Sequence, residues 1–114
     1  MSTITTHVLD TALGCPAAGI SVALERLVAD GTARQIGAGM TDKDGRIRDL
    51  LAPGQSADAG EYRLRFETGA YFARDGRDAF YPFIEVAFRI GADREHYHVP
   101  LLLNPFGYST YRGS

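Results

Sequence analysis

The stretch Glu61-Tyr62-Arg63-Leu64-Arg65-Phe66-Glu67 alternates strictly between apolar and charged side chains. Successive side chains of an extended strand point to opposite faces, so Tyr62, Leu64 and Phe66 are expected to face a core while the charged residues face solvent. The segment Pro82–Ile90 repeats the same alternation. This period of two predicts half-buried β-strands.

Further segments carry the same signal on either side of this stretch. The other expected strands are Ile4–Asp10, Ile20–Val28, Arg34–Thr41, His96–Leu103 and Phe106–Arg112, with a short one at Arg46–Leu50. Turn signals separate them at Gly14-Cys15-Pro16, Asp30-Gly31, Asp44-Gly45, Pro53-Gly54 and Asn104-Pro105. Only Thr68–Arg77 reads as a helix, with Thr68 in the N-cap position and Gly76 as the stop. The pattern predicts an all-β sandwich of seven or eight strands, folded as a single domain over residues 1–114.

The composition excludes several classes of function. The 114 residues are 45% hydrophobic and 23% charged, with a formal net charge of −2. Without a basic surface stripe, binding to nucleic acid or to an anionic membrane has no electrostatic support. Cys15 is the only cysteine, which excludes an intrachain disulfide and a multi-thiolate metal site. The first residues lack the features of a secretory signal, and no apolar run is long enough for a membrane span. We therefore expect a cytoplasmic protein.

Histidines are the first candidates for chemistry. His96 and His98 would point to the same face of a strand, where two imidazoles can converge on a zinc or copper ion. A third ligand would have to come from the distant His7, so the pattern favours a metal-free site or two solvated histidines. His7 lies in the middle of the first expected strand, where it either faces solvent or lines a site. Two histidines on converging strands would suit proton transfer near neutral pH.

Two other segments stand out. Thr41-Asp42-Lys43-Asp44-Gly45 resembles the start of a calcium loop, but the bidentate glutamate expected downstream is absent, so a turn before Arg46 is the better interpretation. Arg46 could hold a planar, electron-rich ligand through its rigid fork of donors. The aromatic segment Phe106–Arg112 would be an exposed edge strand, which a second copy of the chain would cover.

Taken together, these residues resemble the transthyretin-like family, and within it the branch of 5-hydroxyisourate hydrolases. The resemblance runs in order over nearly the whole chain. It rests on His7-Val8-Leu9-Asp10 with Gly14-Cys15-Pro16-Ala17, on Thr41-Asp42-Lys43-Asp44-Gly45-Arg46, on His96-Tyr97-His98-Val99-Pro100-Leu101-Leu102-Leu103, and on the terminal Tyr111-Arg112-Gly113-Ser114. The terminal tetrapeptide matches the hydrolases, whereas hormone-carrying transthyretins are similar only through Ser109-Thr110. Asn104 stands where a small hydroxyl residue is common in the family.

The resemblance implies a two-sheet sandwich of about eight strands with one short helix. It also implies a homotetramer, a dimer of dimers, with active sites in the clefts where dimers meet. The implied activity opens 5-hydroxyisourate to 2-oxo-4-hydroxy-4-carboxy-5-ureidoimidazoline in urate breakdown, with no cofactor. An alternative from the same fold is a carrier that binds a small aromatic ligand without turnover. Two further alternatives are a metal-binding sandwich and an immunoglobulin-like structural module.

The resemblance also implies a role for each site residue. His7 and His98 would flank the substrate ring and share the proton transfers, although the sequence does not say which of them takes the proton from water. Arg46 would clamp the substrate's oxygens. Tyr111 would form part of the pocket wall, while Arg112, Gly113 and Ser114 close the pocket, with Ser114 acting through its hydroxyl or a free carboxylate. His96 is a second-tier candidate.

Overall fold

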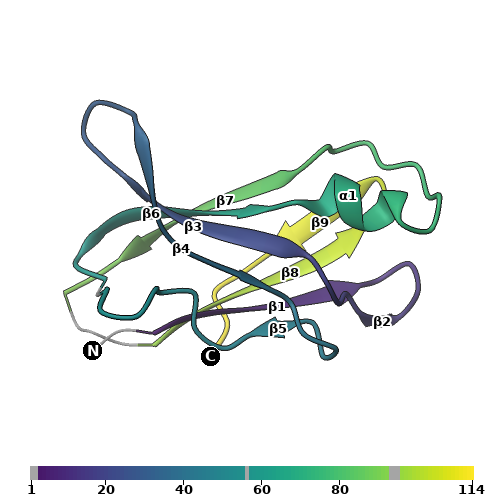
Figure 1. The fold of residues 1–114 in the computed structure, drawn as a ribbon, viewed down its shortest axis with the longest axis horizontal. Helices are drawn as coiled ribbons and strands as arrows, with labels where there is room; N and C mark the ends of the chain where they lie inside the picture. Colours follow the sequence, from purple (N-terminus) through teal and green to yellow (C-terminus); the bar gives the residue numbers. More distant parts are fainter. Residues whose placement is uncertain (1–2, 56, 93–95) are drawn as a thin grey trace.

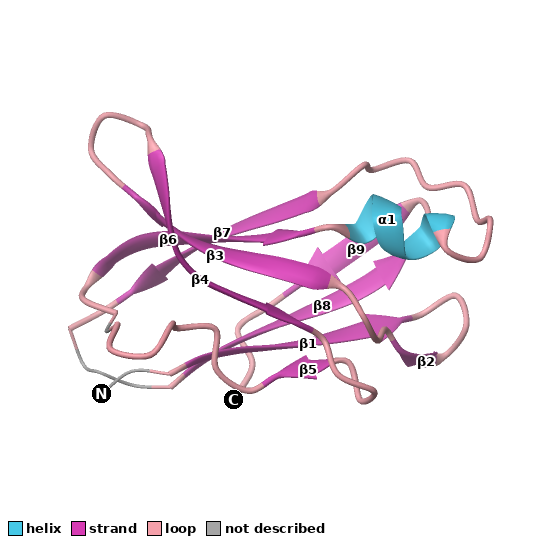
Figure 2. Ribbon diagram, in the orientation of Figure 1, coloured by secondary structure: helices cyan, strands magenta, loops and turns pink. Residues whose placement is uncertain are grey.

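The computed structural model describes residues 3–55, 57–92 and 96–114. Over these residues the chain forms two β-sheets that pack face to face, with one short helix at one end (Figures 1 and 2). The elements are β1 (Ile4–Asp10), β2 (Cys15–Pro16), β3 (Ser21–Leu27), β4 (Ala33–Met40), β5 (Arg46–Ile47), β6 (Gly60–Phe66), α1 (Thr68–Ala73), β7 (Ile84–Ile90), β8 (Tyr97–Asn104) and β9 (Gly107–Thr110). The predicted all-β sandwich is therefore confirmed.

The alternating stretch behaves as its pattern predicts. Tyr62, Leu64 and Phe66 of β6 are fully buried in the core between the sheets. On the opposite face of the same strand, Arg63 donates a hydrogen bond of 2.9 Å from Nε to Glu25, and it also pairs with Glu85. Burying three large apolar side chains on one strand stabilises the fold by roughly 1.5–3 kcal/mol for each.

The sheet that carries the site has the strand order β2-β1-β8-β9, with β5 paired to the free part of β1. β1 and β8 run parallel, so that Thr5 lies opposite His98. β5 pairs antiparallel with β1 and places Arg46 opposite His7. Paired residues on neighbouring strands share a face of the sheet. Because alternate residues of β1 such as Ile4, Val8 and Asp10 are buried, these four polar residues lie on the outer face.

The other sheet is antiparallel throughout, in the order β4-β3-β6-β7. Its edge strand β7 lies at the same side of the sandwich as β9, the edge strand of the first sheet (Figure 1). Large apolar side chains are exposed around β9, including Phe106 at 69% and Tyr111 at 58%. This is the aromatic segment that was predicted from the sequence to form an exposed edge strand.

The helix begins at Thr68, the first residue of the predicted range, but its N-cap and its end differ from the prediction. The N-cap is Glu67 rather than Thr68, and no side chain caps it. Glu67 still donates its backbone N–H to Ser21, so the strand pairing of β6 continues until the residue before the helix. Thr68 is instead buried inside the first turn with Phe72. The helix also ends at Ala73, earlier than predicted, and the chain then turns through Gly76, whose φ of 72° suits glycine.

Several strand boundaries also differ from the predicted ones. The structure gives β5 only two residues, Arg46–Ile47, where a strand to Leu50 was expected. The side chain of Asp49 accepts a hydrogen bond from the backbone of Leu51, a local turn that competes with continued pairing. Cys15–Pro16, predicted as a turn, pairs briefly with the end of β1. His96 precedes β8 rather than beginning it.

A buried carboxylate ties the helix region to β1. Asp10 is 0% exposed and accepts hydrogen bonds from the backbone of Leu13 (3.0 Å), from the Tyr71 hydroxyl (2.8 Å) and from Nη2 of Arg77 (2.8 Å). Burial opposes ionisation, but these donors outweigh it and lower the pKa of Asp10. Burial together with the hydrogen bond to Asp10 raises the pKa of Tyr71 to about 12.

Candidate active site

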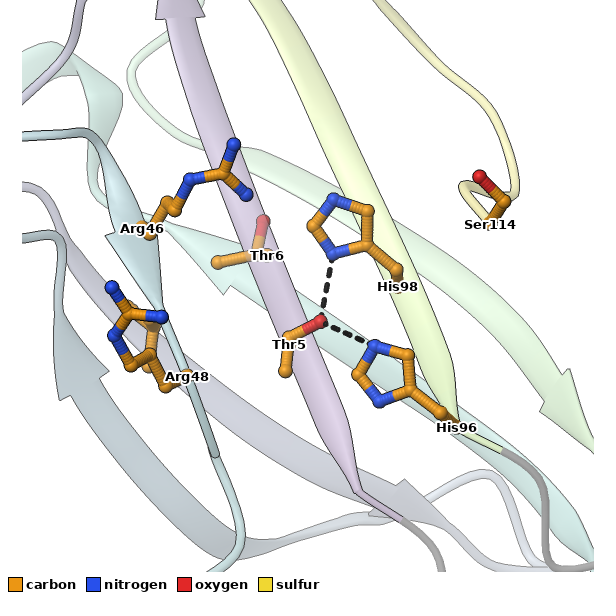
Figure 3. A pocket seen from close by; sticks show the side chains of 8 residues that line it. Thr5, Thr6, Arg46, Arg48, His96, His98 and Ser114 are labelled. Atoms are coloured by element: carbon orange, nitrogen blue, oxygen red, sulfur yellow. Dashed lines mark hydrogen bonds between the residues drawn. The ribbon is translucent and has the colours of Figure 1, made fainter.

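A polar cavity of about 270 Å³ opens on the outer face of the first sheet. Figure 3 shows two arginines on one side of it and two histidines on the other, with a threonine of β1 between them. The lining residues are Thr5, Thr6, Arg46, Ile47, Arg48, His96, His98 and Ser114. They come from β1, from β5 and the residue after it, from β8 and the residue before it, and from the C-terminal segment. The sheet therefore brings together segments that are far apart in the sequence.

The hydroxyl of Thr5 joins the two histidines. Its Oγ1 lies 2.7 Å from Nδ1 of His98 and 3.2 Å from Nε2 of His96. The two rings are almost parallel, with an interplanar angle of 15° and centroids 6.2 Å apart. His96 also makes a hydrogen bond through Nδ1 to the hydroxyl of Thr3. The Nε2 atom of His98 is left pointing away from Thr5 (Figure 3).

The turn before β5 positions Arg46. One oxygen of Asp42 accepts hydrogen bonds from the backbone N–H groups of Asp44 (2.8 Å) and Arg46 (3.0 Å). The hydrogen bond from Arg46 is the main reason that the pKa of Asp42 is lowered. Gly45 has a φ of 75°, and its carbonyl accepts a hydrogen bond of 2.7 Å from Val8. The motif that resembled a calcium loop is thus a tight turn that holds Arg46 beside β1.

The surroundings of His98 favour its neutral form. Burial lowers the pKa of His98 below the ordinary value of 6.5, and the positive charge of Arg46 lowers it further, followed by His96 and His7. A neutral imidazole has one nitrogen with a lone pair, which can take a proton from a bound molecule. The arrangement therefore offers a base at His98 and cationic hydrogen-bond donors at Arg46 and Arg48.

His7 lies on the same face but not in the wall of this cavity. It is half-buried on β1, between Arg46 on one side and Pro100 on the other. It is close enough to contribute to the lowered pKa of His98. The structure therefore places His7 at the border of the cavity.

The C-terminal tetrapeptide divides between two cavities. Ser114 lines the polar cavity, and Gly113 donates its backbone N–H to the carbonyl of His98 at 2.8 Å. Tyr111 and Arg112 instead line a second, more apolar cavity of about 310 Å³ between β7 and β8, which shares His98 with the first. The Arg112 guanidinium lies 4.7 Å from the centroid of the Tyr97 ring. Tyr111 and Arg112 are thus separated from the polar cavity by β8.

The sequence did not single out several cavity residues. Thr5, Thr6, Ile47 and Arg48 line the cavity without having been named as candidates. Thr5 and Arg48 lie two residues from His7 and Arg46, so the strand period alone could have indicated both. The position of Thr5 against both histidines follows from the parallel pairing of β1 with β8, which no local pattern specifies.

Neither a metal cluster nor a membrane-spanning helix is found in the described part of the chain. Over residues 3–55, 57–92 and 96–114, no group of three His, Cys, Asp or Glu side chains could hold a metal ion. The helix found in those residues, α1, has six residues and is too short to cross a bilayer.

Comparison with known proteins assigns the chain to a family. The HIUase/Transthyretin family matches residues 4–113. The chain belongs to this family. It is 49% identical to the 5-hydroxyisourate hydrolase of Salmonella dublin, over 97% of this chain and 80% of that protein. The structure of Klebsiella pneumoniae 5-hydroxyisourate hydrolase superposes with a TM-score of 0.84 at 39% identity, covering 98% of this chain and 99% of that one.

The carrier branch of the family shares the fold equally well. Sea bream transthyretin, solved in complex with thyroxine, superposes with a TM-score of 0.89 at 35% identity, over 97% of this chain and 94% of that one. The backbone alone therefore does not separate the two activities of the family. The side chains of the cavity have to do so.

Proposed function

We propose that this protein is an enzyme that hydrolyses 5-hydroxyisourate to 2-oxo-4-hydroxy-4-carboxy-5-ureidoimidazoline in urate breakdown. The observation that carries the proposal is the polar cavity in which His98, held neutral, faces the guanidinium groups of Arg46 and Arg48. A hydrolase needs such a base and such donors, whereas a carrier of aromatic molecules needs an apolar channel. The hydrolases among its relatives support the same assignment.

The reaction adds water to a ring carbonyl and opens a carbon–nitrogen bond. His98 takes a proton from water through Nε2 while the water oxygen bonds to the carbonyl carbon, whose π electrons move to its oxygen. Arg46 stabilises the oxyanion that results, a contribution typically worth about 10²–10³-fold in rate. The oxyanion then collapses, the carbon–nitrogen bond breaks, and the proton held at His98 passes to the departing nitrogen. The products are a carboxylic acid, which ionises, and an N–H group.

The remaining site residues have supporting roles in this proposal. His7, at the border of the cavity, contacts the far side of the substrate ring and shares in proton transfer. Ser114 provides a polar group on the side of the cavity opposite Arg46 (Figure 3). Arg48 contributes a second positive charge for the substrate's oxygens. Gly113 holds the backbone of His98, while Tyr111 and Arg112 line the neighbouring cavity, which also contacts His98.

The direct test follows the ultraviolet absorbance of 5-hydroxyisourate freshly made from urate by urate oxidase. The compound decays on its own, so catalysis must appear as an acceleration proportional to the protein concentration. We expect clear acceleration at micromolar substrate. No acceleration, together with saturable binding of thyroxine by isothermal titration calorimetry, would replace the proposal with the carrier function.

We further propose that the protein assembles as a homotetramer, a dimer of dimers. The exposed aromatic side chains around the edge strand β9, among them Phe106 and Tyr111, support this, because edge strands of this kind are normally covered. The cavity also lies on the outer face of a sheet, where a second dimer could close it. Sedimentation equilibrium of the purified protein tests the assembly, and a monomer at assay concentrations would contradict it.

A further inference from the structure

We infer that Thr5 and His96 form a hydroxyl-bridged proton relay that leads from His98 to solvent and sets which nitrogen of His98 carries the proton. The inference rests on the proposed function for the role of His98 as base. It also assigns roles to Thr5 and His96, which touch the reacting histidine but are not proposed to touch the substrate's reacting atoms.

The position of Thr5 allows its hydroxyl to couple the two histidines. Its single hydroxyl lies within hydrogen-bond distance of Nδ1 of His98 and of Nε2 of His96. A hydroxyl has one proton and two lone pairs, so it can donate to one of these nitrogens while it accepts from the other. When it does so, the protonation state of one ring sets the direction of the hydrogen bond to the other ring.

Two arrangements of the chain of hydrogen bonds satisfy every group in it. In the first, Nδ1–H of His98 donates to Thr5, the Thr5 hydroxyl donates to Nε2 of His96, and Nδ1–H of His96 donates to Thr3. Nε2 of His98 then has a free lone pair toward the cavity. In the second, every hydrogen bond is reversed and Nε2 of His98 carries a proton. The first arrangement makes His98 a base and the second makes it an acid.

A concerted shift of three protons connects the base form to a charged acid form, which differs from the second arrangement because His96 keeps its Nδ1 proton. When Nε2 of His98 takes a proton from water, its Nδ1 proton moves to the oxygen of Thr5, and the original hydroxyl proton of Thr5 moves to Nε2 of His96. His98 is again neutral but now holds its proton at Nε2, and the positive charge has moved to His96. His96 is exposed and its Nδ1 meets the Thr3 hydroxyl, so the charge is stabilised by solvent.

The environment of each ring suits this direction of transfer. His98 is half-buried and lies near Arg46, whose positive charge disfavours an imidazolium there. His96 is exposed at the end of the cavity away from that arginine (Figure 3). Moving the charge from His98 to His96 takes it farther from Arg46 and brings it to a ring that is exposed to solvent (Figure 3). Return of the proton along the same path restores the base for the next turnover.

The test compares Thr5→Val, which removes the hydroxyl and keeps the shape, with Thr5→Ser, which keeps the hydroxyl. We expect Thr5→Val to lower kcat about tenfold with KM within about twofold of the original value, as is typical when a group that orients a catalytic residue is lost. Thr5→Ser should keep kcat within about twofold. Equal losses in both variants would overturn the role of the hydroxyl.

A second variant separates the orientation of His98 by Thr5 from the transfer of a proton to His96. His96→Gln keeps a hydrogen-bonding partner for Thr5 but has no basic nitrogen, and at an exposed position it does not threaten the fold. We expect kcat to fall at least about fivefold, with the thermal midpoint unchanged. A kcat equal to that of the original protein would overturn the relay to His96.

A measurement that does not depend on turnover distinguishes a failure of this inference from a failure of the proposed function. Long-range ¹H–¹⁵N spectra of the histidine side chains report which nitrogen of His98 is protonated. We expect both Thr5→Val and His96→Gln to change the tautomer populations of His98, and Thr5→Ser to leave them unchanged. If His98 is unaffected by all three, the relay is wrong even if the protein hydrolyses 5-hydroxyisourate. If the tautomers respond but the protein has no activity, the proposed function fails instead.

Discussion

Gly113 lies directly against the ring of His98. Its backbone N–H donates a hydrogen bond of 2.8 Å to the His98 carbonyl, and the two residues form an antiparallel bridge. A Cβ atom at this position would overlap Cδ2 of the imidazole and press on the ring of Pro100. The absence of a side chain at residue 113 is therefore part of what fixes the position of His98.

Gly113→Ala should consequently displace the imidazole and lower kcat/KM by at least about tenfold, since small displacements of a catalytic group are costly. Steady-state kinetics with 5-hydroxyisourate measures the effect. Gly107→Ala in β9 is the matched control, because a Cβ there meets only Asn104, at an ordinary distance of 3.8 Å. Equal activity in the two variants would remove Gly113 from the site.

Removing the proposed acid–base and clamping groups should abolish most of the rate. We expect His98→Ala to lower kcat about 10²–10⁴-fold, the usual contribution of general acid–base catalysis. Arg46→Ala should cost about 10²–10³-fold through loss of oxyanion stabilisation. His7→Ala should also lose most of the rate, with the assembly unchanged in sedimentation. Normal turnover in all three variants would reject the assignment of the site.

The lowered pKa of His98 predicts the pH dependence of the enzyme. The base must be neutral, so kcat/KM should fall as the pH drops through the pKa of His98 in the free enzyme, below its ordinary value of 6.5. Because the charge of Arg46 helps to lower that pKa, Arg46→Met should move the acid limb of the residual activity to higher pH. A pH profile of kcat/KM for both proteins measures this. A limb that stays in place or moves to lower pH would contradict the electrostatic link.

The buried Asp10 should make Arg77 important for stability. Arg77→Met leaves a fully buried carboxylate without its cation, a change that typically costs about 3–5 kcal/mol in the free energy of unfolding. Arg89→Met is the control, because the Arg89–Glu61 pair is 79% and 60% exposed and such pairs contribute at most about 1 kcal/mol. Urea unfolding monitored by circular dichroism compares them. Similar losses in both variants would refute a special role for Asp10.

The same carboxylate should make the fold sensitive to acid. The pKa of Asp10 in the folded protein lies below its ordinary value of 3.8. Its ionised form therefore stabilises the fold above pH 3.8, and this contribution is lost as the pH falls through the folded-state pKa. Asp10→Asn should reduce the slope of the unfolding free energy against pH in this acidic range. An unchanged slope would show that other carboxylates cause the acid sensitivity.

Much of the fold follows from local patterns in the sequence. The alternation in β6 places Tyr62 and Phe66 in the core, and β1 has the predicted bounds Ile4–Asp10. The helix begins at Thr68 as predicted, but its N-cap is Glu67, because Glu67 remains paired with Ser21 in a tertiary contact that overrides the capping preference of Thr68. The cytoplasmic location stays a prediction, which cell fractionation would test.

The site was predicted only in part, because some of its residues meet through tertiary contacts that local sequence patterns do not specify. Arg46 and His98 were candidates by residue type and position, Ser114 was named from the family resemblance, and the structure brings all three to one cavity. Thr5 was not named, because its contact with His98 spans 93 positions in the chain. His7 and Arg112 lie beside the cavity rather than in its wall, an arrangement that depends on the packing of whole strands.

The parallel pairing of β1 with β8 has a consequence for the order in which the protein is made. Every element from β2 to β7 is synthesised between β1 and its central partner β8. Closing so long a loop is slow, because its entropic cost must be met before the contacts form. The nascent chain therefore carries β1 without this partner until β8 has been made. His98 and Ser114 both follow the start of β8, so the polar cavity is complete only after this part of the chain has docked against β1.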